Sequence, residues 1–133
     1  MGTELTYADV VAGVGAAITA YTQALDDGRT DDLIATFCPD GTCDMPGLGH
    51  HEGHDALREA YGRFMPRLPQ RHLVLNTHVT EWDSRRAHAT SDIVLLLKGD
   101  AGWSVQLVGR YRDVLHRDGD DWRFHSRVAE FVA

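Results

Sequence analysis

The sequence is poor in cysteine, in positive charge and in long apolar runs. Its 133 residues include two cysteines, Cys38 and Cys43. The turn Pro39-Asp40-Gly41 between them could bring the thiols together, but two thiols are too few for the disulfide framework of a small secreted protein, so we expect a reduced, cytosolic pair.

Thirteen Lys and Arg against twenty Asp and Glu give a net charge of -7. This balance argues against nucleic acid and anionic membrane surfaces as partners.

Signals for export and membrane insertion are also missing. The stretch Met1 to Tyr7 has no Lys or Arg, so the basic start of a secretory signal peptide is lacking. Val10 to Ala20 is apolar but too short to span a bilayer. We therefore expect a cytoplasmic protein. A glycine-rich phosphate loop, a Ser-His-Asp set and a basic patch with aromatics are lacking too, which argues against nucleotide, acyl-transfer and nucleic-acid functions.

What the sequence does contain is the composition of an ordinary globular domain. Hydrophobic residues make up 43% and charged residues 25%. A chain of this length can bury roughly two-thirds of the surface that its unfolded form exposes. We therefore expect a single domain over residues 1–133 that folds without disulfides.

Helical spacing marks the first part of the chain. Apolar residues recur every three or four positions at Val11, Val14, Ile18, Tyr21 and Leu25. This stripe predicts a helix that Thr6 caps, with Asp9 in its first turn and Gly28 just beyond its end.

Two shorter helices and a short strand are expected next. Thr30 begins the second helix, whose buried side is predicted to be Leu33, Ile34 and Phe37. Residues 39–41 form a turn, residues 42–45 a short strand and residues 46–53 a loop. The third helix is predicted from His54 to Phe64.

From Arg71 onward the apolar period changes to two. This alternation predicts strands near residues 71–82, 86–98, 102–116 and 121–132. Turn residues at Asp83-Ser84, Gly99-Asp100 and Asp118-Gly119 connect them. Three helices followed by an antiparallel meander indicate an α+β fold, in which the helices cover one face of a strongly curved sheet.

Several short motifs, in this order and spacing, resemble one known family, the SnoaL-like branch of the nuclear transport factor 2-like superfamily. They are Tyr21-Thr22-Gln23-Ala24-Leu25-Asp26-Asp27-Gly28, Glu52-Gly53-His54-Asp55-Ala56-Leu57, Arg71-His72-Leu73-Val74-Leu75-Asn76, Gly109-Arg110-Tyr111-Arg112-Asp113 and Asp118-Gly119-Asp120-Asp121-Trp122-Arg123-Phe124. The resemblance covers nearly the whole chain. It implies a cone-shaped α+β barrel, a curved antiparallel sheet wrapped by three N-terminal helices, a homodimer, and a small apolar molecule held in the cone without a cofactor.

The resemblance also implies a catalytic pair. Several lyases of the family, scytalone dehydratase and hexachlorocyclohexane dehydrochlorinase among them, use an aspartate and a histidine as the base, and Asp26 and His72 are the matching positions. The residues alone favour the interpretation of Asp26 as a solvated helix-end acid. Strand alternation alone would place the face carrying Leu73 and Leu75 in the core and turn His72 outward.

Further pocket contacts are expected around this pair. Tyr21 lies on the apolar stripe of the first helix, and Asn76 and Tyr111 could orient a substrate oxygen. Asp113 is a second ionisable candidate, although the residues alone favour Tyr111 and Asp113 as groups that satisfy buried partners. Trp103 is expected as core or pocket wall.

A metal site is not expected. His50, His51, Glu52 and His54 offer suitable ligand types, but they lack the helical spacing of a zinc motif and lie in a glycine-rich loop. His88, His116 and His125 are expected on outward faces among charged neighbours.

Three functions remain open at this stage. The first is a cofactor-independent lyase or isomerase of the dehydratase, ketosteroid-isomerase or polyketide-cyclase type, with His72 as base and Asp26 as its orienting partner. The second is a non-catalytic small-ligand-binding or structural module, since a fold hosts many functions. The third is the small subunit of a ring-hydroxylating oxygenase.

Overall fold

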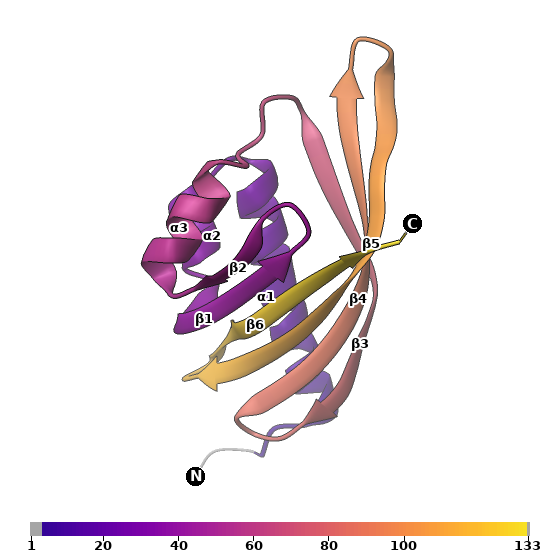
Figure 1. The fold of residues 1–133 in the computed structure, drawn as a ribbon. Coiled ribbons are helices and arrows are strands. Elements are labelled where there is room, and N and C mark those ends of the chain that lie inside the picture. The colour runs from indigo at the N-terminus through magenta and orange to yellow at the C-terminus, as the bar shows by residue number, and fades with distance from the viewer. Residues whose placement is uncertain (1–3, 133) are drawn as a thin grey trace.

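A computed structural model describes residues 4–132 of the chain. Within them the elements, in chain order, are α1 (Tyr7–Asp26), α2 (Thr30–Ile34), β1 (Phe37–Met45), β2 (Gly49–Glu52), α3 (His54–Gly62), β3 (Gln70–Trp82), β4 (Arg86–Gly99), β5 (Gly102–Asp118) and β6 (Asp121–Phe131). The helices gather on one side of a curved, unclosed sheet, and the far end of the β4–β5 hairpin extends away from them (Figure 1). None of the helices in residues 4–132 has the length and apolarity needed to cross a bilayer.

Helix α1 begins as the sequence predicts. The Thr6 hydroxyl accepts a hydrogen bond from the backbone N–H of Asp9 at 3.1 Å, and the Asp9 carboxylate accepts one from the backbone N–H of Thr6 at 2.9 Å. This reciprocal pair satisfies two N–H groups that an α-helix leaves unpaired at its start. The apolar stripe is shifted by one residue at this end, because Val10 is fully buried whereas Val11 is exposed.

The sheet is larger than the predicted meander. Its order is β2-β1-β6-β5-β4-β3, and β3 to β6 form the expected antiparallel meander. Two strands extend it: β1 pairs parallel with β6, and β2 pairs antiparallel with β1. The expectation of a loop over residues 46–53 is therefore wrong at Gly49–Glu52, which is β2.

The predicted turn at residues 39–41 is also wrong, since these residues lie inside β1. The β1–β6 register shifts between Phe37 and Thr42, so the irregular stretch is absorbed within the strand. A Cβ atom at Gly41 would lie 2.8 Å from the carbonyl oxygen of Phe124. Glycine is therefore required here by the close approach of the two backbones.

A bulge in β3 decides which side chains face the helices. The β3–β4 register shifts between Leu75 and His78, and Asn76 there has a φ of 55°. Before the bulge His72 faces inward while Leu73 and Leu75 are 42% and 47% exposed. After it, Val79 is buried. Simple alternation across residues 72–79 fails because the bulge changes which residues face the core.

The core lies between the helices and the concave face of the sheet. Its centre is aromatic: the Tyr21 ring meets Phe37, Tyr61, Tyr111 and Phe124 edge-on, with centroids 5.6–6.3 Å apart. Edge-to-face packing of this kind stabilises beyond the buried area alone. Tyr21 thereby ties α1 to α3 and to strands of the sheet.

Candidate active site

An apolar pocket opens beside this aromatic core. Its volume is about 180 Å³. Its lining comes from α1, the β1–β2 turn, α3 and the strands β3 to β6: Tyr21, Leu25, Met45, Pro46, Leu48, Tyr61, Phe64, Gln70, His72, Ile93, Leu95, Leu107, Tyr111, Ala129 and Phe131. Polar groups are few among these residues, as is usual for sites that bind small molecules.

Asp26 and His72 meet at the edge of this pocket. The Nδ1 atom of His72 lies 2.6 Å from Asp26 Oδ1, and the two side chains are 12% and 5% exposed. His72 lines the pocket. Asp26 lies behind the ring and borders a groove between α1 and β3. The histidine therefore stands between the carboxylate and the pocket.

The carboxylate of Asp26 is held by several donors. Besides the imidazole, the backbone N–H of His72 donates to Oδ2 at 2.8 Å and the Gln70 amide donates to Oδ1 at 3.2 Å. Asp26 is the last residue of α1, where the helix dipole disfavours negative charge. These N–H groups at the start of β3 offset that cost and fix the carboxylate.

The tautomer of His72 follows from its partner. An ionised carboxylate only accepts hydrogen bonds, so the Nδ1 atom must carry the proton that lies between the two groups. In a neutral imidazole the other nitrogen, Nε2, is then a free acceptor. The arrangement therefore leaves Nε2 of His72 able to accept a proton.

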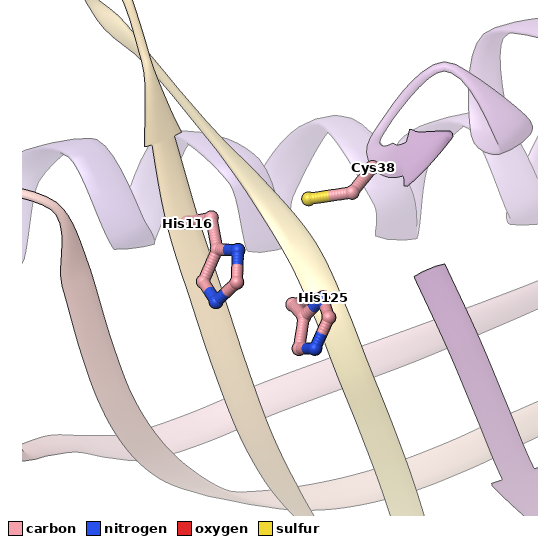
Figure 2. Close-up of side chains that lie close together, drawn as sticks. All are labelled: Cys38, His116 and His125. Atoms are coloured by element: carbon pink, nitrogen blue, oxygen red, sulfur yellow. The ribbon is translucent and has the colours of Figure 1, made fainter. Parts of the chain in front are cut away.

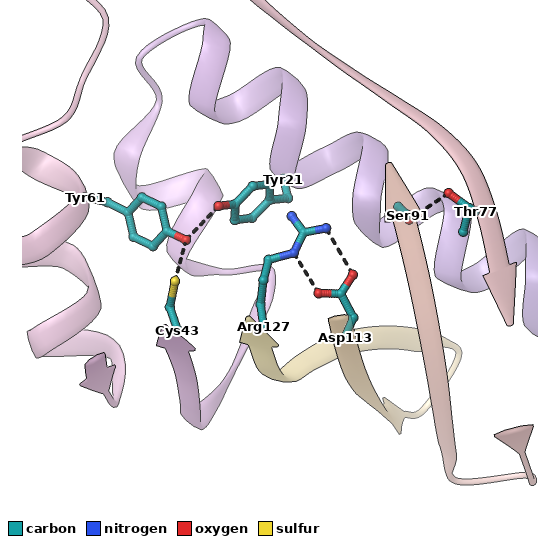
Figure 3. A network of polar contacts seen from close by, with 7 residues as sticks. All are labelled: Tyr21, Cys43, Tyr61, Thr77, Ser91, Asp113 and Arg127. Atoms are coloured by element: carbon teal, nitrogen blue, oxygen red, sulfur yellow. Dashed lines mark hydrogen bonds and ion pairs between the residues drawn. The ribbon is translucent and has the colours of Figure 1, made fainter. Parts of the chain in front are cut away.

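Two tyrosine hydroxyls meet on the same side of the core. The hydroxyls of Tyr21 and Tyr61 are 2.6 Å apart, and the Tyr61 hydroxyl lies 3.1 Å from the sulfur of Cys43 (Figure 3). Burial raises the pKa of both tyrosines well above the ordinary value. Both phenols stay neutral at physiological pH, and because one hydroxyl donates to the other, one O–H remains to donate to a further acceptor.

A buried ion pair lies beneath the tyrosines. Arg127 of β6 donates to both oxygens of Asp113 on β5, at 2.8 and 3.1 Å, and both side chains are 0% exposed (Figure 3). The guanidinium carbon lies 3.5 Å from the centroid of the Tyr111 ring and 4.2 Å from that of Tyr21. Burial raises the pKa of Asp113, and Arg127 opposes that shift. The pair supports the tyrosine rings from below.

A family model described as a SnoaL-like domain matches residues 7–128. The chain belongs to the SnoaL-like domain family. The resemblance drawn from the short motifs is thereby confirmed. A search of curated proteins finds no match.

Solved structures share the architecture of this SnoaL-like protein. A Catenulispora acidiphila protein in complex with S-DNPA is 26% identical, with a TM-score of 0.83 over 93% of this chain and 94% of that one. The function-unknown Rv3472 of Mycobacterium tuberculosis is 24% identical, with a TM-score of 0.85 over 92% and 71%. A candidate scytalone dehydratase from Novosphingobium aromaticivorans is 17% identical, with a TM-score of 0.81 over 92% and 84%.

These neighbours fix the fold of the SnoaL-like chain. Further neighbours are a nuclear transport factor 2-like protein with a cystatin-like fold from Novosphingobium aromaticivorans and a protein of unknown function with a cystatin-like fold from Nostoc punctiforme. The expected cone-shaped α+β fold is confirmed, with the sheet curved but unclosed and extended by β1 and β2.

The structure brings some of the predicted site residues together and separates others. Tyr21, His72 and Tyr111 line the pocket of the SnoaL-like domain, and Asp26 contacts His72. Asp113 does not line it, because its carboxylate is bound by Arg127. Of the two interpretations of Asp113, the structure favours the buried partner.

Asn76 and Trp103 do not line this pocket. Asn76 lies at the β3 bulge, where its amide donates to Asp92 at 2.8 Å on the outer face of the sheet. Trp103 is 50% exposed near the β4–β5 turn and pairs in register with Lys98. The bulge and the length of that hairpin carry the two side chains away from the cone.

The histidines of β2 and α3 have separate partners. His51 Nε2 lies 2.6 Å from the carbonyl oxygen of Leu48, and His54 Nε2 lies 2.9 Å from that of Phe37. His50 lies beside Asp44 on the surface. Their rings make local contacts with the backbone and with one surface acid.

Sequence reasoning missed Tyr61, Gln70 and Arg127. A signal for Arg127 was present, because the β5–β6 meander pairs it in register with Asp113. An arginine that opposes an aspartate on the inward face of two paired strands indicates a buried ion pair. For Tyr61 and Gln70 the linear pattern contains no comparable signal.

Proposed function

We propose that this protein is a cofactor-independent lyase or isomerase that moves a proton on a small, largely apolar molecule. The supporting observation is the Asp26–His72 pair, nearly buried, with the imidazole facing an apolar pocket. A general base that is oriented by a carboxylate and shielded from water suits proton abstraction next to a carbonyl group.

In the proposed step the substrate loses a proton from a carbon beside its carbonyl. The C–H proton moves to Nε2 of His72, and the electron pair of that bond passes to the carbonyl oxygen as an enolate. Where a C=C bond is conjugated with the enolate, the imidazolium then returns the proton to the far carbon of that dienolate and the double bond shifts, which completes an isomerisation. Where the substrate carries a hydroxyl on the β carbon, the electron pair re-forms the carbonyl and makes a C=C bond, and the hydroxyl leaves with the proton as water. The Asp26 carboxylate stabilises the imidazolium while it exists.

The tyrosines would supply a hydrogen-bond donor for the enolate oxygen. Tyr21 and Tyr61 both line the pocket, and their neutral hydroxyls are already linked to each other. A phenol donor that is fixed before the reaction favours a developing oxyanion without reorganisation. We propose that these hydroxyls, with Tyr111 beside them, bind the carbonyl oxygen of the substrate.

The pocket limits the substrate to a small molecule. Its volume of about 180 Å³ is close to the roughly 150 Å³ of an apolar cavity that holds benzene. A molecule with one ring, or two fused rings, that carries a carbonyl group fits this space.

Hydrogen–deuterium exchange tests the proposal without knowledge of the natural substrate. Bicyclic aromatic ketones such as 1-indanone and 2-tetralone are incubated in D₂O with the protein, and loss of the proton signal beside the carbonyl is followed by NMR. Exchange above the buffer rate is expected for the wild type, and return to the buffer rate for His72→Gln. His78→Gln, an exposed histidine on the same strand, is the matched control.

The alternative is a binding module without catalysis. It is favoured by the complex of the 26% identical Catenulispora acidiphila protein with S-DNPA. Under this alternative the ketones protect the protein against thermal unfolding, yet exchange stays at the buffer rate in the wild type. That result rejects the proton-transfer proposal.

We further propose that the protein pairs with a second copy through the outer face of its sheet. We call this the outer apolar face: Leu73, Leu75, Val94 and Val108, none of them buried, on three adjacent strands. Ion pairs of Arg110 with Asp92 and of Arg112 with Glu130 lie beside it. An apolar patch rimmed by both signs of charge can complement itself across a two-fold axis.

A further inference from the structure

Three metal-ligating side chains meet outside the pocket. Cys38 on β1, His125 on β6 and His116 on β5 lie on adjacent strands, and one ligand atom from each lies within 4.8 Å of the others. In Figure 2 the Cys38 thiol points toward the two imidazoles. None of the three lines the candidate active site.

A β-bulge creates this cluster. The β5–β6 register shifts between Val114 and Leu115, which leaves His125 as an extra residue between Phe124 and Ser126. Phe124 stays in the core, and the His125 ring packs on His116 with centroids 4.1 Å apart and planes 10° from parallel. Bulges characteristically redirect a side chain in this way.

Two potential ligand atoms in this cluster have a weak hydrogen bond or none. The Nδ1 atom of His125 is buried and has no hydrogen-bond partner among the described residues. The sulfur of Cys38 has a long contact of 3.7 Å with the carbonyl oxygen of Arg123. Two imidazoles, one of them with an unpartnered nitrogen, and a thiol thus face one another.

We propose that Cys38, His116 and His125 bind one transition-metal ion of the zinc class. A thiolate with two imidazoles is a donor set that zinc and its neighbours prefer over magnesium or calcium. The carboxylate of Asp40, 4.0 Å from His125 Nδ1, or a water molecule would fill the fourth position. On binding, the sulfur–metal bond replaces the S–H bond, and the thiol proton passes to solvent.

The geometry needs only a small adjustment. Zinc–sulfur and zinc–nitrogen bonds of about 2.3 and 2.0–2.1 Å place tetrahedral ligands roughly 3.3–3.6 Å apart. Ligand atoms that lie within 4.8 Å of each other must therefore approach by up to about 1.2–1.5 Å. Rotation of the two imidazoles about their broad χ2 torsions supplies this movement.

Binding would link three strands of the sheet. β1 is an added strand whose pairing with β6 is interrupted by a register shift. An ion shared by β1, β6 and β5 would tie that strand to the meander. Because the three ligands come together only in the folded chain, the ion stabilises the native state.

Cobalt titration tests the site directly. Untagged protein, reduced and freed of metal by a chelator, is titrated with Co²⁺ while its absorption spectrum is recorded. One equivalent is expected to give tetrahedral visible bands and a thiolate-to-cobalt charge-transfer band, and zinc is expected to displace both. A titration without a charge-transfer band overturns the proposal, because it shows that no thiolate binds the ion.

Variants locate the site. Cys38→Ser is expected to abolish the charge-transfer band, and His116→Gln and His125→Gln to weaken zinc binding at least about tenfold. His50→Gln removes an exposed histidine outside the cluster and is expected to change nothing. Circular dichroism confirms that each variant is folded, and a zinc-dependent rise in melting temperature should occur in the wild type and in His50→Gln alone. Equal binding in wild type and His125→Gln would also overturn the proposal.

Discussion

Replacing Asp26 by asparagine separates the chemistry of the proposed pair from its contribution to stability. The carboxylate accepts from Nδ1 of His72 at 2.6 Å, from its backbone N–H at 2.8 Å and from the Gln70 amide at 3.2 Å. An asparagine of the same shape has one acceptor oxygen and one donor amide. It therefore cannot accept from all three N–H groups.

The expected response is a change of tautomer. If the new amide donates to Nδ1, the proton of the neutral imidazole must move to Nε2, the nitrogen proposed to accept the substrate proton. A hydrogen bond to a charged acceptor contributes about 1.5–3 kcal/mol, so Asp26→Asn should lose about that much unfolding free energy and remain folded. Because the base then holds its proton in the wrong place, ketone exchange should fall about 10²- to 10⁴-fold.

Two measurements check this reasoning. Nitrogen chemical shifts of ¹⁵N-histidine-labelled protein report which ring nitrogen of His72 carries the proton, and urea unfolding reports stability. His78→Gln serves again as the folded control on the same strand. A variant with normal exchange, or with the proton still on Nδ1 and lost exchange, would refute the argument that Asp26 acts by orienting the base.

The remaining predictions concern stability and assembly. Asp113→Asn should lower the free energy of unfolding, measured with urea, by about 3–5 kcal/mol, because it leaves Arg127 as an unpaired buried charge. The double variant Asp113→Leu with Arg127→Met should recover most of that loss, and a double variant whose loss equals the sum of the single losses would contradict this. Burial raises the pKa of Cys43 from 9.0 to about 11, so its stabilisation is full below pH 9 and declines as pH rises toward 11; Cys43→Ala should flatten that part of the profile. Val108→Glu on the outer apolar face should convert a dimer to a monomer in analytical ultracentrifugation, whereas a monomeric wild type would reject the dimer.

The helices and the meander could be predicted because their signals are local. The Thr6 cap, the stripe of α1 and the two-residue period after Arg71 each depend on neighbours in sequence. Strands β1 and β2 could not be predicted in the same way. The pairing of β1 with β6 connects residues some 80 positions apart, and β1 contains Pro39 and Gly41, which normally indicate a turn. β2 pairs with β1 alone, so its place in the sheet depends on β1.

The candidate site was predicted in part, and the conflict over which way His72 faces has one physical origin. Asp26 and His72 were placed by the family resemblance, whereas strand alternation favoured the opposite face of β3. The bulge at Asn76 explains the conflict, because the residues before and after it follow different registers. A single extra residue reverses every inference about facing that extends across it.

The same sensitivity to bulges connects the two sites of the sheet. The shift at His125 allows both Phe124 and Arg127, three positions apart, to point into the core, where strict alternation would turn one of them outward. Arg127 can therefore reach Asp113 and lie against the rings of Tyr21 and Tyr111. The bulge in β6 thus has two consequences. On the concave face of the sheet it places Arg127 beneath the tyrosines of the pocket, and on the other face it places His125 next to His116 and Cys38. Straightening this bulge is therefore expected to disturb both proposed sites.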